Sequence, residues 1–474
     1  MIFANCDYTE NVRFFIRGSY FYLLFIMLVS VINPSLAGIV ADKKAAKNQQ
    51  PNIHHYIEDK KLCKVQDAYC QGATFTTVNI VTPNEHGVSH NKYDKFNITL
   101  GKGFNRVFLN NLEINSPGFV GNPNLVNQTA TVILNEVTSN KQSELYGALS
   151  VIGAKAHVII ANPSGIRCNN CQFINTDHVT LTTGSPLFTA GVLTGYEVNQ
   201  GDISIDRNGL KFDDNPNAFL DLFSATLGVD GEIRGGIIQA IIGKQNIIRT
   251  PIRKRFDTQL IGDHFGNEVT NVAIDVTQLG GMYANKIFLY SKNGGIQNKG
   301  MLEAETVVSL ASASFIKNST GRIYSPKTKL RSSGDIDIVS GKIKSERQGV
   351  NYKIDERFGI RILGRNINSS ESSFYANSGY ISIEAADSIN NWNSIIKSNA
   401  TSGLADISLK AKLVNNNNGH IVTSQNILID ANELRNNNGR IISAFRDVNL
   451  SYKTLSNEEG VIYGGIDVNR IIKK

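Results

Sequence analysis

Two cysteines stand close together in the stretch 156–184, as Cys168-Asn-Asn-Cys171. Two thiols at this spacing can form a redox couple, supply half of a zinc site or close a small disulfide loop. A redox pair usually sits at a helix N-terminus, and no helix is predicted here. A zinc site would need the other close pair, Cys63 and Cys70, in the same place. We therefore favour a structural disulfide over the redox and zinc alternatives.

The other residues with metal-binding chemistry give weaker signals. His86 and His90 are four residues apart, a ligand spacing only on a helix, and they lie in a predicted loop, so we interpret them as a surface pair. Calcium could bind a group of four aspartates, but the glycine-rich nonapeptide of calcium-binding β-helices is missing, and a solvated turn is favoured. These aspartates are Asp202, Asp206, Asp213 and Asp214. The chain lacks zinc-protease, phosphate-loop, hydrolase and dinucleotide motifs. We predict a protein that is not an enzyme, with no cofactor and no metal.

The N-terminus predicts export. Arg13 and Arg17 precede the apolar run Phe21–Ile32, which as a helix would span about 18 Å, too short for a hydrocarbon core of about 30 Å. We predict a signal peptide over residues 1–37, cleaved between Ala37 and Gly38; an uncleaved membrane anchor is the alternative. Export would place the remaining cysteines in an oxidising compartment, which favours two local disulfides, Cys63–Cys70 and Cys168–Cys171.

Turn residues must position these groups, and two Asn-Pro sequences stand out. The first is Asn122-Pro123-Asn124-Leu125 and the second is Asn162-Pro163-Ser164-Gly165-Ile166. Proline presets φ for a turn, Asn and Ser accept hydrogen bonds from nearby backbone N–H groups, and Gly allows positive φ. Apolar strands at Val158–Ala161 and Val179–Thr183 flank the second motif, a pattern typical of one coil of a β-solenoid.

These motifs resemble the secretion domain of filamentous haemagglutinin-type exoproteins of two-partner secretion systems, a family that includes haemolysins and contact-dependent growth-inhibition proteins. The first family motif is unaltered here, and the second has Ser164 where the family has Asn. The similarity extends from about Gly38 to Gly300. It implies an all-β right-handed parallel β-helix with an N-terminal cap and short antiparallel extra-helical hairpins. It also implies that both motifs contribute to turn geometry and to recognition by an outer-membrane β-barrel transporter.

A period of about 20 residues continues beyond the region of resemblance. Asn-Asn-Asn-Gly419 recurs as Asn-Asn-Asn-Gly439 after 20 residues and as Asn-Glu-Glu-Gly460 after 21. Such a period is typical of parallel β-helix coils, with Asn stacked in ladders at equivalent turns. We expect seven apolar side chains to point inward, namely Ile421, Leu428, Leu434, Ile441, Val448, Leu455 and Ile462. The predicted domains are a signal peptide (1–37), a secretion domain (38–300) and further β-helix repeats (301–474).

Charge and resemblance together suggest the partners. The net charge of +7 is mildly basic and favours anionic glycans or lipids on a host or neighbouring cell. We do not expect nucleic acid to be a partner, because no recognition helix or aromatic-basic platform is predicted. The expected function is that of a monomeric exoprotein, exported across the periplasm and outer membrane, that acts as a surface or released adhesin. The alternative is a truncated haemolysin or growth-inhibition toxin that lacks its effector region.

Overall fold

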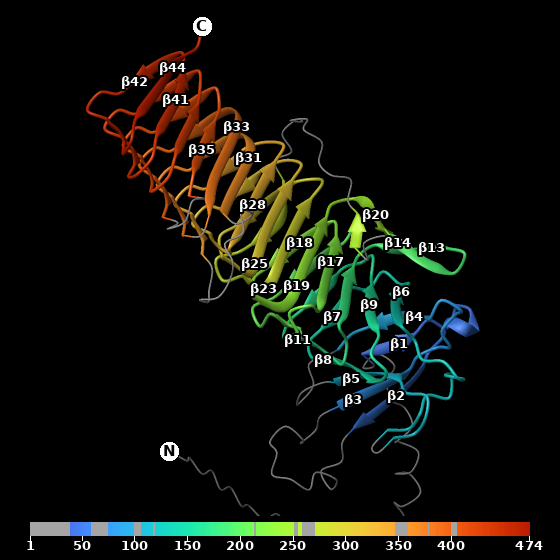
Figure 1. The fold of residues 1–474 in the computed structure, drawn as a ribbon. Coiled ribbons are helices and arrows are strands. Elements are labelled where there is room, and N and C mark those ends of the chain that lie inside the picture. Colours follow the sequence, from blue (N-terminus) through green and yellow to red (C-terminus); the bar gives the residue numbers. More distant parts are fainter. Residues whose placement is uncertain are drawn as a thin grey trace, which may run out of the picture. The chain divides into compact units, whose positions relative to one another are not determined.

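A computed structural model describes residues 38–57, 74–98, 106–116, 119–212, 215–250, 255–257, 271–346, 359–377, 379–399 and 405–474. These residues are mostly β-strand, with one short 3-10 helix at Lys47–Gln49 (Figure 1). Residues Ile39–Lys474 form one compact unit. The predicted signal peptide and the predicted Cys63–Cys70 pair lie outside the described residues.

The strands form a parallel β-helix. A network of 40 strands is hydrogen-bonded so that, apart from two antiparallel strands at its N-terminal end, each strand pairs with strands one coil earlier or later and not with its neighbour in sequence. For example, Val179–Thr182 pairs in parallel with Val158–Ala161 on one side, and His178–Thr182 pairs with Phe219–Phe223 on the other. Successive coils contribute strands to three parallel sheets, which we call sheet 1, sheet 2 and sheet 3. The predicted fold class is confirmed.

Sheets 1 and 2 contain the longest strands, several of which turn from sheet 1 into sheet 2 without a break. Sheet 1 contains β3 (Thr74–Asn79), β5 (Arg106–Asn111), β8 (Ala148–Gly153), β11 (Cys171–Ile174), β16 (Leu210–Lys211), the first parts of β19 (Glu232–Ile242), β23 (Gly281–Ser291) and β25 (Met301–Ser312), then β27 (Arg322–Tyr324), β30 (Lys342–Ser345), β32 (Ser373–Ala376), β34 (Ile395–Ser398), β37 (His420–Thr423), β40 (Arg440–Ser443) and β43 (Val461–Gly464). Sheet 2 contains β4 (Val88–Phe96), β6 (Val132–Val137), β9 (His157–Ala161), β12 (His178–Thr182), β17 (Phe219–Ser224), the second parts of β19, β23 and β25, then β28 (Lys327–Ser332), the first parts of β31 (Gly359–Asn368) and β33 (Tyr380–Asn390), β35 (Ile407–Lys410), β38 (Ile427–Asp430), β41 (Val448–Tyr452) and β44 (Val468–Ile472).

Sheet 3 is built from short strands. It contains β7 (Ser143–Leu145), β10 (Ile166–Cys168), β15 (Asp202–Ile205), β18 (Thr226–Val229), β22 (Val272–Val276), β24 (Gly295–Asn298), β26 (Ile316–Lys317), β29 (Ile336–Asp337), the second parts of β31 and β33, β36 (Leu413–Asn415), β39 (Glu433–Arg435) and β42 (Thr454–Ser456). Pairing continues across residue 300, where β23 pairs with β25 in sheets 1 and 2. The domain boundary at 300 stays a prediction.

Two antiparallel strands cover the first coil. β1 (Ile39–Ala41) pairs antiparallel with β4, and β2 (Asn52–Ile57) pairs antiparallel with β3. An uncovered first coil would expose unpaired backbone groups and the open end of the core. These strands are therefore the N-terminal cap that the resemblance implied.

A separate antiparallel sheet lies outside the coils. It has four strands: β13 (Ser185–Thr189), β14 (Val192–Val198), β20 (Gln245–Thr250) and β21 (Arg255–Asp257). Two chain segments far apart in sequence build it, since β13 and β14 leave the coil after β12 whereas β20 and β21 leave it after β19. We call it the extra-helical sheet.

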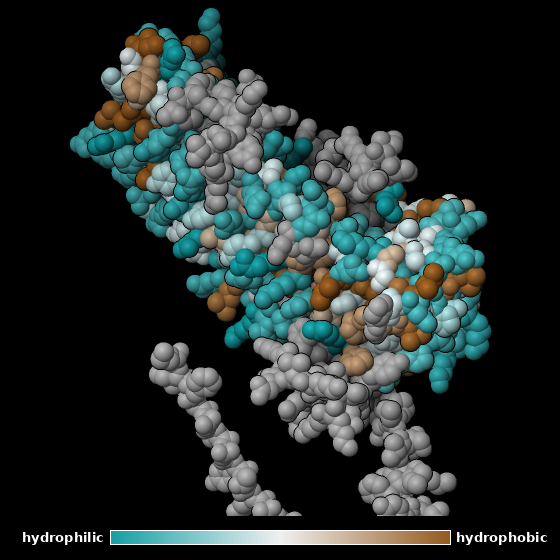
Figure 2. Space-filling model, turned by 60° about the horizontal axis from the view of Figure 1, so that its bottom comes forward, coloured by the Kyte–Doolittle hydropathy of each residue, from teal (hydrophilic) through white to brown (hydrophobic). Residues whose placement is uncertain are grey.

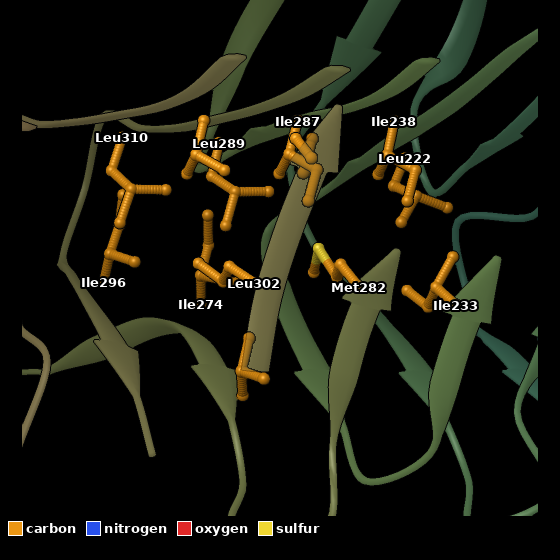
Figure 3. Close-up of a cluster of buried hydrophobic side chains, with 14 of the residues drawn as sticks. Leu222, Ile233, Ile238, Ile274, Met282, Ile287, Leu289, Ile296, Leu302 and Leu310 are labelled. Atoms are coloured by element: carbon orange, nitrogen blue, oxygen red, sulfur yellow. The ribbon is translucent and has the colours of Figure 1, made fainter. Parts of the chain in front are cut away.

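The core follows from alternation within each strand. In β30 the burial of Lys342–Ser345 alternates, with Ile343 and Ser345 inside, because successive side chains of a strand point to opposite faces. Parallel pairing then places the inward residue of one coil against the inward residue of the next coil. Ile233, for example, pairs with Met282, and Met282 pairs with Leu302. Figure 3 shows such apolar side chains stacked from coil to coil. The result is one continuous hydrophobic core.

Buried asparagines form the predicted ladders. Asn391 Nδ2 donates to Asn416 Oδ1, Asn416 Nδ2 to Asn436 Oδ1 and Asn436 Nδ2 to Asn457 Oδ1, each at 2.6 Å. An earlier pair, Asn298 and Asn318, makes the same bond at 2.6 Å. Each amide thereby satisfies the amide of the next coil inside the protein.

One predicted core position is wrong. Leu428 is 45% exposed, whereas Ile427 and Ile429 on either side of it are buried. Since all three residues are apolar, hydropathy could not indicate which face of β38 points inward. Pairing of Ile427 with Ile407 and with Val448 decides it.

The last coil exposes much of its apolar surface. Ile466, Ile471 and Ile472 are each more than half exposed, as are Tyr463 in β43 and Phe445 just before β41. Figure 2 shows a largely hydrophilic surface with hydrophobic residues gathered at that end, at the upper left. No coil in the described chain covers these side chains.

Candidate functional site

The first Asn-Pro motif lies between β5 and β6, at the corner between sheets 1 and 2. Asn122 is buried, and its Nδ2 donates to the carbonyl oxygens of Ile80 and Asn110, both at 2.9 Å. Its Oδ1 accepts the N–H of Asn124 at 2.9 Å, which closes an Asx turn. Ile80 occupies the same corner one coil earlier, between β3 and β4. One side chain therefore ties two coils together.

The rest of this motif connects the corner to the cap and the core. Asn124 Nδ2 donates to Asn52 Oδ1 in cap strand β2 at 3.0 Å, and Thr82 Oγ1 donates to the Asn124 carbonyl oxygen at 2.7 Å. Leu125 is buried in the main core, whereas Pro123 is exposed at the tip of the turn. The motif therefore couples the cap to the first two coils.

The second motif lies between β9 and β10, at the corner between sheets 2 and 3. Asn162 is fully buried, and its Nδ2 donates to the carbonyl oxygen of Lys141 and to Ser143 Oγ, both at 2.9 Å. Its Oδ1 accepts the N–H of Ser164 at 2.9 Å. Ile166, two residues later, is fully buried in the core.

The departure from the family motif at Ser164 leaves this turn intact. Ser164 supplies the N–H that the Asx turn needs, which any residue except proline can do. Its hydroxyl lies 3.4 Å from the Ser139 carbonyl oxygen, a longer bond than Asn124 makes to Asn52 at the equivalent position. Gly165 has φ of 108°, which an L side chain rarely adopts.

The two motifs thus share one construction at different corners of the coil. In both, a buried Asn donates to a carbonyl oxygen of the preceding coil, accepts the N–H two residues ahead, and is followed by an apolar side chain in the core. The spacing of the two motifs in the sequence could not show that the first follows sheet 1 and the second follows sheet 2. The reason is that the number of strands in each coil is set by the tertiary structure.

Cys168 and Cys171 face each other across the corner between sheets 3 and 1. The structure joins them as a disulfide, with Cα atoms 5.6 Å apart, and both side chains are fully buried. Cys168 ends β10 and Cys171 begins β11, so neither lies at a helix N-terminus. The pair has the position of a structural staple on a tight turn.

The predicted histidine pair does not converge on one point. His86 Nε2 hydrogen-bonds the Ala190 carbonyl oxygen at 3.0 Å, and His90 Nε2 lies 2.6 Å from Glu136 Oε2. His90 lies on β4, not in a loop, and its ring stacks on Phe188 with centroids 5.2 Å apart. Both histidines therefore hold the β13–β14 hairpin against the first coil.

A polar cluster on the outer face of sheet 2 was not found from the sequence. The rings of His157 and His178 stack with centroids 3.6 Å apart, and His178 Nε2 lies 2.6 Å from Asp221 Oδ2. His157 Nε2 lies 2.8 Å from Thr180 Oγ1. Asp221 is only 2% exposed. Three successive strands, β9, β12 and β17, supply these residues, which only inter-coil register brings together.

The extra-helical sheet covers the neighbourhood of this cluster. Tyr196 and Ile247 of that sheet pack on Ile159 and Phe223 of sheet 2 in a second hydrophobic core. Burial lowers the pKa of His157 well below its usual value, and the charges of His178 and Arg249 act in the same direction. Burial also raises the pKa of Tyr196. The lowered pKa of His157 favours its neutral form in this cluster.

A second carboxylate, that of Glu136, lies on the same outer face of sheet 2. Burial by itself would raise the pKa of Glu136, but the hydrogen bond from His90 and the charges of His90 and Lys92 outweigh it and lower the pKa. This ion pair lies between β4 and β6 of the first coils.

The described residues contain no group of three or more His, Cys, Asp or Glu side chains arranged to hold a metal ion. Of the predicted aspartates, Asp206 pairs with Arg167 at 2.6 Å, and Asp213 and Asp214 lie outside the described residues. Within the same ranges, no helix has the length and apolarity needed to cross a bilayer.

Comparison with known proteins connects this geometry to a family. Residues 54–324 match the family described as the TPS secretion domain. A toxin CdiA of Yersinia pestis is 34% identical over 302 residues, which cover 62% of this chain and 8% of that protein. A hemolysin of Proteus mirabilis is 41% identical over 173 residues, which cover 35% of this chain and 10% of that protein. The matched part is thus a small fraction of either relative.

A solved structure is also similar to this chain. The crystal structure of the filamentous hemagglutinin secretion domain has 25% sequence identity and a TM-score of 0.47, and the match covers 71% of this chain and 94% of that one.

Proposed function

The chain belongs to the two-partner secretion (TPS) domain family, and from that premise we propose that it is recognised by a dedicated outer-membrane β-barrel transporter and exported through it. A signal peptide over residues 1–37, cleaved between Ala37 and Gly38, would first deliver it to the periplasm. The proposed domains are the secretion domain, residues 38–300, and further coils over residues 301–474. N-terminal sequencing of secreted protein tests the cleavage site.

The shared construction of the two Asn-Pro corners supports this proposal. Asn122 and Asn162 each need carbonyl oxygens of the preceding coil as acceptors, so each corner closes only on a coil already in place. Such dependence favours folding coil by coil as the chain emerges, because each finished coil templates the next. The transporter would then bind surfaces that these corners shape. In the oxidising periplasm we expect the Cys168–Cys171 bond to form.

Secretion of corner variants tests the proposal. Asn122→Ala or Asn162→Ala leaves buried acceptors unsatisfied, at about 1–3 kcal/mol, which we expect to cut secreted protein roughly tenfold. The measurement is the amount in the medium and in the cell when the chain is expressed with its transporter. Intracellular synthesis should be unchanged.

The matched control is Asn436→Ala. Asn436 is fully buried and also donates to a neighbouring amide, but it lies beyond the matched residues 54–324. We expect this variant to be secreted within about twofold of the wild type, since its coil emerges late and carries no motif. Equal loss for all three variants would mean that secretion reports general stability, and the motif roles would be withdrawn.

After export we propose that the chain acts as a monomeric adhesin on a host or neighbouring cell surface, with anionic glycans as ligands. The mildly basic net charge of +7 and an outer surface built of long parallel sheets support this role. Light scattering of the secreted protein tests the monomeric state, and binding of fluorescent protein to cells tests adhesion.

A second candidate is a haemolysin or growth-inhibition toxin. The match to the Proteus mirabilis hemolysin favours it. Erythrocyte lysis and cell binding, measured with the same purified protein, separate the two. Lysis without stable binding would favour the toxin; binding without lysis would favour the adhesin.

A further inference from the structure

A basic pocket opens on the outer face of sheet 1. Arg207, Asn208, Lys211, Glu232 and Arg234 line a space of about 130 Å³. The side chains come from the turn before β16, from β16 itself and from β19, where Lys211 and Arg234 are ladder partners. All five residues are exposed.

The positive charge of this pocket is only partly neutralised. Glu232 Oε2 accepts hydrogen bonds from Arg234 Nε at 3.0 Å and Nη2 at 2.7 Å. That pair holds the Arg234 guanidinium 4.6 Å from the centre of the Tyr283 ring, on the next coil. Among the described residues, neither Arg207 nor Lys211 has an acidic partner within ion-pair distance. These two cations and an oriented guanidinium suit a sulfate, phosphate or carboxylate group.

The pocket begins a column of outward side chains along sheet 1. Arg234 pairs with Tyr283 and Tyr283 with Glu303, which in turn pairs with Tyr324. Parallel strands in register place these residues above one another, about 4.8 Å apart. The column therefore continues the pocket in the direction of the coil axis, with one acidic residue in it.

Beyond Glu303 the column alternates rings and cations. Tyr324 pairs with Lys344, Lys344 with Tyr375 and Tyr375 with Lys397. Lys344 also forms an ion pair with Glu346. The alternation gives an aromatic face on every second coil and an ammonium on the coils between.

A parallel column beside it adds two more cations. Arg322 pairs with Lys342 in register, and Lys342 Nζ lies 5.9 Å from the centre of the Tyr375 ring. Neither Arg322 nor Lys342 makes an ion pair with a described acidic residue. On this part of sheet 1 basic side chains outnumber acidic ones, so the face attracts anions.

We propose that the outer face of sheet 1, from the pocket at Arg207 to Lys397, binds a linear acidic polysaccharide. The proposal rests on the proposed adhesin function and names the site of that function. Charge complementarity carries it, because cations recur along a line of about 34 Å, seven steps of 4.8 Å, with Lys211 and Arg234 at one end and a second group from Arg322 to Lys397 at the other. A linear polymer with repeated sulfate or carboxylate groups matches a line of charges, whereas a single small anion would occupy only the pocket.

The tyrosines favour sugar rings over nucleobases. Tyr283, Tyr324 and Tyr375 are half-buried on this sheet face, so each ring exposes only part of its apolar surface. Single-stranded nucleic acid is usually bound in a groove with protruding rings that stack successive bases. A pyranose chain can lie across a flat face, with its apolar ring edges on Tyr and its anionic groups on Lys and Arg.

Binding of dextran sulfate to the full-length secreted protein tests the site, with uncharged dextran of the same length as reference. In Arg207→Gln/Lys211→Gln and in Arg322→Gln/Lys342→Gln, we expect affinity at low salt to fall about tenfold and the salt dependence to become shallower, because phosphate-like contacts are lost. The matched control, Lys329→Gln/Arg361→Gln, removes the same charge from two exposed ladder partners on sheet 2 and should change affinity less than about twofold. All variants should keep wild-type unfolding transitions.

Each outcome decides a different claim. Equal loss of affinity in the control and sheet 1 variants would overturn the site, as would no binding of dextran sulfate by a wild type that still adheres to cells. Tighter binding of a single-stranded DNA of equal charge, lost in Tyr324→Ser/Tyr375→Ser, would overturn the ligand class. Binding to dextran sulfate at sheet 1 without adhesion to any cell would instead contradict the proposed adhesin function and leave the site standing.

Discussion

The Asn-Pro corners of the first coils and the asparagine ladder of the last coils solve one problem in two ways. Asn122 donates to one carbonyl oxygen of its own coil and one of the preceding coil, whereas Asn162 donates to a carbonyl oxygen and a hydroxyl of the preceding coil. In the ladder, Asn416 and Asn436 bond to the same residue type at the same position of the next coil. Each corner is therefore specific to its place, whereas the ladder repeats and can be extended by copying.

The difference shows which part of the chain depends on particular residues and which part depends only on a repeated residue type. A repeating ladder needs only that each coil resemble its neighbour, and the left-handed residues Asn418 and Asn438, with φ of 57° and 53°, recur with it. The Asn-Pro corners instead join the cap and the first coils, where successive coils differ. A substitution in the ladder should therefore act through one repeated bond, and a substitution in a corner through several unlike ones.

Replacing a buried Asn by Asp should cause the largest loss of stability, and the loss should be greater in the asparagine ladder than in an Asn-Pro corner. Asn416→Asp places an acceptor against the Asn436 amide oxygen and removes the donor to the Gly419 carbonyl oxygen, so we expect a loss of about 3–5 kcal/mol. Asn162→Asp should cost about 1–3 kcal/mol, because the Ser143 hydroxyl can rotate to donate to the new carboxylate. Urea unfolding, with hydrogen exchange to locate the damage, measures both. A larger loss at position 162 would contradict this account of the two regions.

Acid should weaken the first coils and spare the last. The pKa of His157 is lowered in the folded state, so the unfolded chain takes up the proton first as pH falls below about 6.5. The contribution of His157 to the free energy of unfolding is therefore fully present above that pH. It is lost as pH falls towards the folded pKa, by up to about 1.4 kcal/mol per pH unit. The charges of His178 and Arg249 act on the imidazole of His157, and Asp221 contacts His178.

Hydrogen exchange at pH 7.5 and pH 5.0, corrected for intrinsic rates, tests this expectation. Protection should fall in β9, β12 and β14 and stay constant in β37 and β40. Measurement at pH 5.0 stays above the range in which Glu136 loses its contribution, since its pKa is lowered from 4.5. His157→Gln keeps a hydrogen-bonding group near Thr180 without titrating, and should abolish the difference; an unchanged difference would assign it to another group.

Reduction of the disulfide should have the smallest and most local effect. Cys168 and Cys171 enclose a very short loop, so the bond restricts the unfolded chain little and should contribute about 2 kcal/mol or less. We expect faster exchange at β10 and β11 only, with the ladder coils unchanged, measured with and without reductant. Unfolding of the whole β-helix on reduction would show that this corner holds more than its own coil.

Local chemistry allowed much of the fold to be predicted. The 20-residue recurrence of Asn and Gly located the turns of the last coils, because amide capping and left-handed φ are requirements that few residues meet. The Asn-Pro sequences located two corners for the same reason. The buried side of β38 was mispredicted at Leu428, since an apolar run has no alternation to read.

The sequence by itself determined the β-helix period, the cap and the residues that turn the chain, because each depends on neighbours within one coil or on motifs that name a family. Only the tertiary structure decided that the two Asn-Pro motifs occupy different corners, and that His157, His178 and Asp221 meet beneath a sheet from two distant segments. It also aligned Lys211, Tyr324 and Lys397 in one column. These arrangements depend on the register between coils, which is set by pairing across tens of residues and not by any local pattern.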